Sequence, residues 1–75
     1  MAVIRLHLTL IEMAGGRREF TVDAEQPVVL TTFLERFGIP HEEVGIIVRN
    51  GKSDTIDCLI RQEDNVELFP ILSGG

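Results

Sequence analysis

Residues 28–37, VVLTTFLERF, carry the pattern on which the fold depends. The apolar positions recur at helical spacing on one face: Val29 or Leu30, Phe33, Leu34 and Phe37. Gly38 supplies a C-terminal stop, and Pro40 reinforces it because a residue before proline is disfavoured in the helical region. No Ser, Thr, Asp or Asn caps the other end, so we predict a helix that begins between Pro27 and Leu30.

Two alternating stretches precede this helix. Residues 3–11, VIRLHLTLI, place apolar side chains at every second position, which predicts a strand with one buried face. Residues 13–16, MAGG, are a turn signal, and residues 18–23, REFTVD, alternate again. The two stretches are predicted to pair as an antiparallel hairpin.

Strand patterns also follow the helix. Residues 44–49, VGIIVR, are apolar on both sides and β-branched, which is typical of a central strand, and Asn50-Gly51 is predicted to end it as a turn. Residues 52–64 are mixed and predict a short edge strand or a turn of helix. Three of their side chains are available for the core: Ile56, Leu59 and Ile60. Residues 66–69 read as a last strand, which Pro70 is expected to end.

The order strand, strand, helix, strand, variable stretch, strand predicts an α+β fold in which the helix covers one face of a sheet. The first and last strands can then lie side by side and parallel in the middle. This is the ubiquitin-like β-grasp arrangement, with a mixed sheet of four to five strands packed on one helix. We expect residues 1–69 to form the β-grasp domain and residues 70–75 to form a flexible C-terminal tail ending in Gly-Gly.

Size and charge restrict the function. A chain of 75 residues is one small domain, so a deep cleft with its own catalytic machinery is not expected. The net charge of −5 argues against nucleic acid or an anionic membrane as a partner and favours a partner with a basic face. Cys58 has no second cysteine to pair with, and no signal peptide or membrane-spanning stretch is visible, which predicts a cytoplasmic protein.

Several residue types that often carry chemistry have simpler interpretations here. His7 and His41 lack other ligands at metal-site spacing, so no metal site is expected. Cys58 is interpreted as a small buried apolar residue. The acidic residues of the second half are interpreted as a solvated surface because they lack the alternation of a calcium loop: Asp54, Asp57, Glu63 and Asp64.

The C-terminus is the strongest candidate for chemistry. Ser73-Gly74-Gly75 presents a carboxylate with little steric cover, since glycine has no Cβ and can enter a narrow channel in many conformations. The six residues from Pro70 to Gly75 can extend to at most about 20 Å, which is enough to thread a partner's pocket. Gly75 is predicted to react and Gly74 to be its required slim neighbour. The residues that partners are expected to grip are Phe69, Pro70, Ile71, Leu72 and Ser73.

Taken in order, these motifs resemble the MoaD/ThiS family of ubiquitin-like sulfur carriers, which includes the small subunit of molybdopterin synthase and the thiamine-pathway carrier. The resemblance spans the chain. It is carried by Phe33-Leu34, Phe37-Gly38-Ile39, Ile47-Val48-Arg49-Asn50-Gly51, the run from Asp64 to Pro70, and Ser73-Gly74-Gly75. Glu63 departs from the family, in which a glycine often precedes the Asp of a tight turn.

The resemblance implies a cosubstrate or a non-catalytic small subunit. A ubiquitin-activating-like adenylating enzyme would join the Gly75 carboxylate to AMP, using ATP and Mg²⁺ that this chain does not itself bind. Sulfur from a persulfide donor would then form a thiocarboxylate. A sulfur-acceptor synthase, with a larger molybdopterin synthase subunit as one candidate, would consume it. Phe69-Pro70 before a short Ser-Gly-Gly end favours molybdopterin over thiamine synthesis.

Two other functions stay open at this point. A ubiquitin-like modifier needs the same adenylation and differs in its acceptor, the lysines of other proteins. A noncovalent β-grasp interaction module would use the body of the domain and leave the tail without a role. The fold does not separate these functions, because related folds host unrelated activities.

Overall fold

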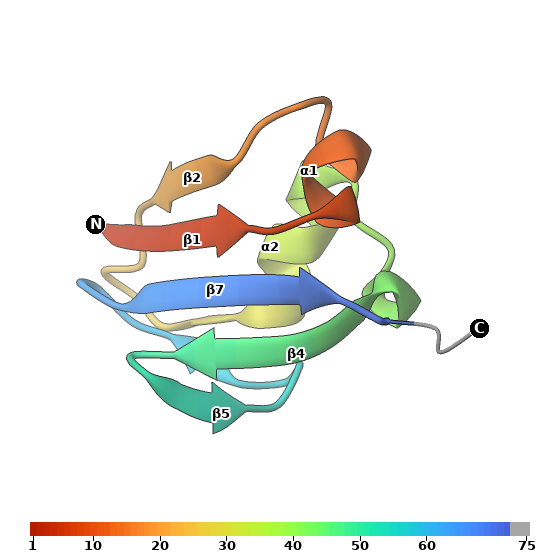
Figure 1. The fold of residues 1–75 in the computed structure, drawn as a ribbon. Helices are drawn as coiled ribbons and strands as arrows, with labels where there is room; N and C mark the ends of the chain where they lie inside the picture. Colours follow the sequence, from red (N-terminus) through yellow and green to blue (C-terminus); the bar gives the residue numbers. More distant parts are fainter. Residues whose placement is uncertain (73–75) are drawn as a thin grey trace.

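The computed structural model describes residues 1–72 and has the predicted α+β architecture. Five strands form one mixed sheet in the order β2-β1-β7-β4-β5, and helix α2 lies behind it (Figure 1). The strands are β1 (Ala2–Leu6), β2 (Glu19–Val22), β4 (Val44–Arg49), β5 (Lys52–Asp54) and β7 (Asn65–Pro70). β1 and β7 run parallel in the middle, with Ile4 opposite Val66, and the other pairs are antiparallel. The ubiquitin-like β-grasp arrangement is therefore confirmed.

Helix α2 (Leu30–Phe37) begins within the predicted interval and ends where Gly38 takes a left-handed conformation at φ 77°. Ile39 closes this end by donating its amide to the carbonyl of Leu34 at 2.9 Å. No side chain caps the start. Instead, the amide of Leu30 donates to the carbonyl of Cys58 at 2.9 Å, which attaches the helix to the loop before β6.

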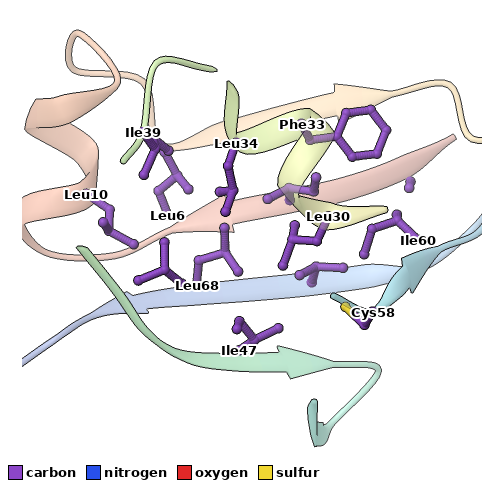
Figure 2. Close-up of a cluster of buried hydrophobic side chains, with 14 of the residues drawn as sticks. Leu6, Leu10, Leu30, Phe33, Leu34, Ile39, Ile47, Cys58, Ile60 and Leu68 are labelled. Atoms are coloured by element: carbon purple, nitrogen blue, oxygen red, sulfur yellow. The ribbon is translucent and has the colours of Figure 1, made fainter. Parts of the chain in front are cut away.

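The core lies between α2 and the sheet (Figure 2). Leu30, Phe33 and Leu34 of the helix are fully buried, as are Ile4 of β1 and Leu68 of β7. These positions match the helical and alternating patterns of the sequence. The apolar face of the helix and the apolar face of the sheet are removed from water by packing against each other.

The hairpin β1–β2 is confirmed, but the predicted strand over residues 3–11 is wrong beyond Leu6. Leu8 adopts φ 56° and ψ −130°, which breaks the strand, and helix α1 (Thr9–Met13) follows. Leu10 is fully buried, with Ile11 and Ala14 packed against the core. Their spacing fits one face of a helical turn, so the apolar run continues while its period changes from two to that of a helix.

The variable stretch contributes two short strands. β5 pairs with β4 at the sheet edge across Asn50-Gly51, which have φ values of 53° and 81° as a two-residue hairpin loop requires. β6 (Leu59–Ile60) pairs with β3 (Val28–Val29) in a separate two-stranded sheet. The predicted edge strand is confirmed by β5, and the predicted turn at Asn50-Gly51 is confirmed as well. The pairing of β3 with β6 has no counterpart in the prediction.

Candidate functional site

We call residues 69–72, which partners are predicted to grip, the stem. The stem begins at the end of the central strand β7 and continues away from the sheet (Figure 1). Pro70 lies inside β7 and is buried, so the expectation that it ends the strand is wrong by one residue. The amide of Ile71 donates to the carbonyl of Glu43 at 3.1 Å, on the β4 side. The Pro70 nitrogen therefore faces the β1 side. The last bond there runs from the His7 amide to the Leu68 carbonyl, and the His7 carbonyl accepts from the Leu10 amide, so the missing N–H of Pro70 removes no ladder bond.

Gly45 allows this close passage. A Cβ atom at position 45 would lie 2.9 Å from the Cα of Ile71 and 3.0 Å from the carbonyl oxygen of Pro70. The β4–β7 register also shifts between Val44 and Ile46, as in a β-bulge. The stem therefore packs against the backbone of Gly45, which has no side chain, and is hydrogen-bonded to Glu43, the residue before β4.

Phe69 lies on the sheet face opposite the helix. Its ring stacks on His7, with centroids 4.4 Å apart and planes at 7°. On the other side, Phe69 pairs in register with Ile46, whose side chain is 49% exposed. His7 is held in turn by Glu67, with Nε2 and Oε1 3.1 Å apart. The predicted stem residue Phe69 is therefore part of a sheet-face surface formed with His7 and Ile46.

Exposed apolar side chains continue this surface to the end of the described chain. Ile71 is 55% exposed and Leu72 is 74% exposed, next to the half-exposed Ile46. Such a grouping is typical of a protein-docking surface. Ile46, His7 and Gly45 are site residues that the sequence interpretation did not identify. The one available signal was that residues 44–49 carry apolar side chains on both faces while the single helix can cover only one.

Ser73, Gly74 and Gly75, to which the sequence assigns the chemistry, lie outside the described residues. The other predicted contact residues, 69–72, are described, and they lie at the end of β7 and directly after it. From Leu72 the three remaining residues can extend at most about 10 Å.

A polar network occupies the opposite end of β7 from the stem. Asp64 is only 7% exposed, so its assignment to a solvated acidic surface is wrong. Its carboxylate accepts hydrogen bonds from Asn50 Nδ2 at 2.8 Å, from the Arg61 amide at 2.8 Å and from Arg49 Nη1 at 3.3 Å. Burial acts to raise the pKa of Asp64, but these donors outweigh it and hold the pKa below its usual range.

Arg49 joins this network to the β4–β5 hairpin. Its Nε donates to Asp54 Oδ2 at 2.9 Å, and this bond raises the pKa of the guanidinium. The Thr55 amide, with Arg49 second, lowers the pKa of the Asp54 carboxyl. These groups satisfy one another and none faces the stem. We assign them to holding the hairpin against the turn before β7.

The remaining reactive side chains have structural surroundings. Cys58 is buried in the core, and burial raises the pKa of its thiol, so the interpretation as a small apolar residue is confirmed. His41 lies on the 3₁₀ turn η1 (His41–Glu43), with Nε2 3.6 Å from Glu35 Oε2. Within residues 1–72, no three His, Cys, Asp or Glu side chains are grouped as metal ligands would be. None of the helices described over the same span has the length and apolarity needed to cross a membrane.

The fold and the stem define a ubiquitin-like β-grasp protein. The chain belongs to the Mut7-C ubiquitin family, whose model matches residues 4–74. A search of curated proteins finds no match. The predicted resemblance is confirmed at the level of a ubiquitin-like protein by this family and by the fold of solved relatives.

Three solved structures illustrate that likeness. SAMP1 from Haloferax volcanii is 22% identical with a TM-score of 0.70, over 99% of this chain and 98% of that one. A second structure of the H. volcanii small archaeal modifier protein 1 is 20% identical, with a TM-score of 0.69, over 95% and 97% of the two chains. A Pyrococcus furiosus protein, described provisionally as molybdopterin converting factor, subunit 1, is 16% identical, with a TM-score of 0.61, over 95% and 97%. At these identities the likeness is one of fold.

Proposed function

We propose that this protein is a sulfur carrier whose C-terminal Gly75 carboxylate is activated by adenylation and converted to a thiocarboxylate. The observation that carries the proposal is the seating of the stem. Pro70 is buried in the central strand, Ile71 is hydrogen-bonded to Glu43, and Leu72 is then 74% exposed. The body thus holds the chain up to Ile71, four residues before Gly75, a distance suited to presenting a carboxylate to another enzyme.

The chemistry follows from the weakness of a carboxylate as an electrophile. One Gly75 carboxylate oxygen attacks the α-phosphate of ATP in the activating partner, releasing pyrophosphate and forming an acyl adenylate. The terminal sulfur of a persulfide attacks the acyl carbon and displaces AMP. A thiol then reduces the resulting acyl disulfide to the thiocarboxylate. This chain supplies only the carboxylate and its presentation, so it acts as a cosubstrate and not as a catalyst.

The sheet-face surface supplies the affinity for these partners. Phe69, Ile46 and Ile71 lie beside the point where the stem leaves the body, so a partner bound there would receive the tail directly. We propose three partners in sequence, namely an adenylating enzyme that holds ATP and Mg²⁺, a persulfide donor and a sulfur-acceptor synthase. The fold shared with the P. furiosus protein supports molybdopterin synthesis as the pathway.

Conjugation to lysines of other proteins is the second candidate function. It is favoured by the shared fold with H. volcanii SAMP1, which is described as a small archaeal modifier. Both functions require the adenylate and diverge only when sulfur or an amine attacks it.

Intact mass spectrometry separates these functions. The full chain is incubated with its adenylating enzyme, ATP, Mg²⁺ and a persulfide donor. The carrier function predicts a mass gain equal to replacing one oxygen by sulfur, and the modifier function predicts lysine-linked conjugates in a cell extract. An unchanged mass and no conjugates would reject both in favour of a noncovalent interaction module.

Two variants locate the reaction. Gly74→Val is expected to abolish the mass change, because a β-branched side chain would keep the tail out of the narrow channel of the adenylating enzyme. The melting temperature should be unchanged. Deletion of Gly74 and Gly75 should have the same effect. Thr21→Ala, an exposed change on β2, is the control and should react like the parent. Full activity in the deletion variant would contradict the proposal.

A further inference from the structure

A second surface lies where β1 leaves the sheet and turns into α1, and it adjoins the sheet-face surface at His7. It is a hollow of about 450 Å³. Leu6, Leu8 and Ile11 supply its apolar lining, Arg5, Arg18 and Glu19 supply its charged lining, and His7 completes it. Apart from His7, none of its lining residues has a role in the proposed sulfur chemistry.

Leu8 is held there in a costly backbone conformation. Its φ of 56° and ψ of −130° lie outside the regions that residues with a side chain normally occupy, so this backbone conformation is strained. Burial does not offset this strain, because Leu8 is 62% exposed. A glycine would make the same turn without strain. A strained and exposed leucine in such a turn is therefore explained better by binding than by folding.

The charge of the hollow is opposite to that of the protein. The chain carries a net charge of −5, yet two arginines and one glutamate line the hollow. Arg5 Nε is paired with Glu19 Oε1 at 2.9 Å. Arg18 is exposed and takes part in no ion pair within residues 1–72. The hollow thus offers an apolar floor with an available guanidinium at its rim.

We propose that this hollow docks an acidic segment of a partner protein that carries an aliphatic side chain. The aliphatic group packs against Leu8 and Ile11, and a neighbouring carboxylate pairs with Arg18. A guanidinium can hold a carboxylate through two parallel hydrogen bonds, which fixes the orientation of the segment. The inference stands independently of the chemistry at Gly75, so either one can fail without the other.

The test is an NMR titration of the ¹⁵N-labelled full chain with two capped peptides that share two central leucines. One peptide is flanked by Asp and Glu and the other by Lys. The acidic peptide should shift the amides of Leu8, Ile11 and Arg18 and bind about tenfold more tightly than the basic one, since reversing the charge costs roughly 1.4 kcal/mol or more. Its affinity should fall as salt is added.

Leu8→Gly separates binding from folding. It should raise the melting temperature by removing the strain, yet weaken the acidic peptide by about tenfold or more, because a leucine side chain is lost from the contact. Arg18→Glu should weaken the acidic peptide and strengthen the basic one. Arg61→Glu is its matched control, an exposed arginine on the loop before β7, and should leave both affinities unchanged.

Four outcomes would overturn the inference. These are equal affinity for both peptides, shifts confined to Ile46 and Leu72, a peptide affinity unaffected by Leu8→Gly, or concentration-dependent shifts at the hollow without peptide. The last of these would identify a second copy of this chain as the occupant.

Discussion

The imidazole ring of His7 lies flat on the phenyl ring of Phe69, with centroids 4.4 Å apart. His7 follows the last residue of β1, and Phe69 is the penultimate residue of β7. The stack therefore ties the two central parallel strands together beside the point where the stem leaves the body. It is a contact within the sheet-face surface that also holds the first residue of the stem.

A double-mutant cycle should detect this link. His7→Ala and Phe69→Ala are each expected to destabilise the fold, and the double variant should cost less than their sum. Aromatic pairs contribute about 0.5–1.5 kcal/mol beyond the area that they bury. Urea denaturation measures the coupling. Its absence would mean that the two rings are held independently by their strands.

Glu63→Gly is expected to stabilise the protein by about 0.5–1 kcal/mol, because Glu63 has a φ of 69° that glycine adopts without cost. The substitution removes the ion pair between Glu63 and the N-terminal amine, but that pair is exposed and such pairs contribute little. Thermal denaturation checks the gain. Glu63→Ala is the control: it removes the same ion pair, keeps the strained φ and should not stabilise.

Asp64→Asn should destabilise the protein by about 1–3 kcal/mol at neutral pH, since buried donors lose a charged acceptor. The pKa of Asp64 is lower in the folded state than in the unfolded state. Its stabilisation is therefore complete above the unfolded pKa and is lost as the pH falls below about 4 through the folded pKa.

Denaturation curves recorded across this acid range test that pH dependence. The parent protein should lose stability more steeply than Asp64→Asn as the pH falls. Asp57→Asn, at an exposed position on the loop before Cys58, is the matched control and should follow the parent. Parallel curves for the parent and Asp64→Asn would contradict the assignment of this carboxylate.

Gly45→Ala should displace the stem. The added Cβ would meet the Ile71 backbone at 2.9 Å, so the chain must shift at a cost of about 1–3 kcal/mol. We expect the Ile71 amide to exchange faster with solvent as its bond to Glu43 weakens. Ser53→Ala on the edge strand β5 is the control. Unchanged exchange at Ile71 would show that Gly45 does not seat the stem.

Local patterns determined the parts of the fold whose causes are local. The stripe over residues 30–37 with Gly38 after it predicted α2, and Asn50-Gly51 predicted the hairpin loop, because helical period and turn conformation are properties of neighbouring residues. The diglycine terminus likewise identified the candidate reacting group from covalent structure, and that assignment stays a prediction.

Only the tertiary structure decided the conformation and burial of residues whose surroundings come from distant parts of the chain. The run from Leu6 to Leu10 keeps its alternation, yet Leu8 turns outward and Leu10 enters the core on a helix. In the sequence Asp64 has no feature that distinguishes it from a surface acid, and only the fold places Asn50 and Arg49 next to its carboxylate. Pro70 stays in β7 because the adjacent strand has already ended. Each of these outcomes depends on a partner distant in the chain, which no local pattern specifies.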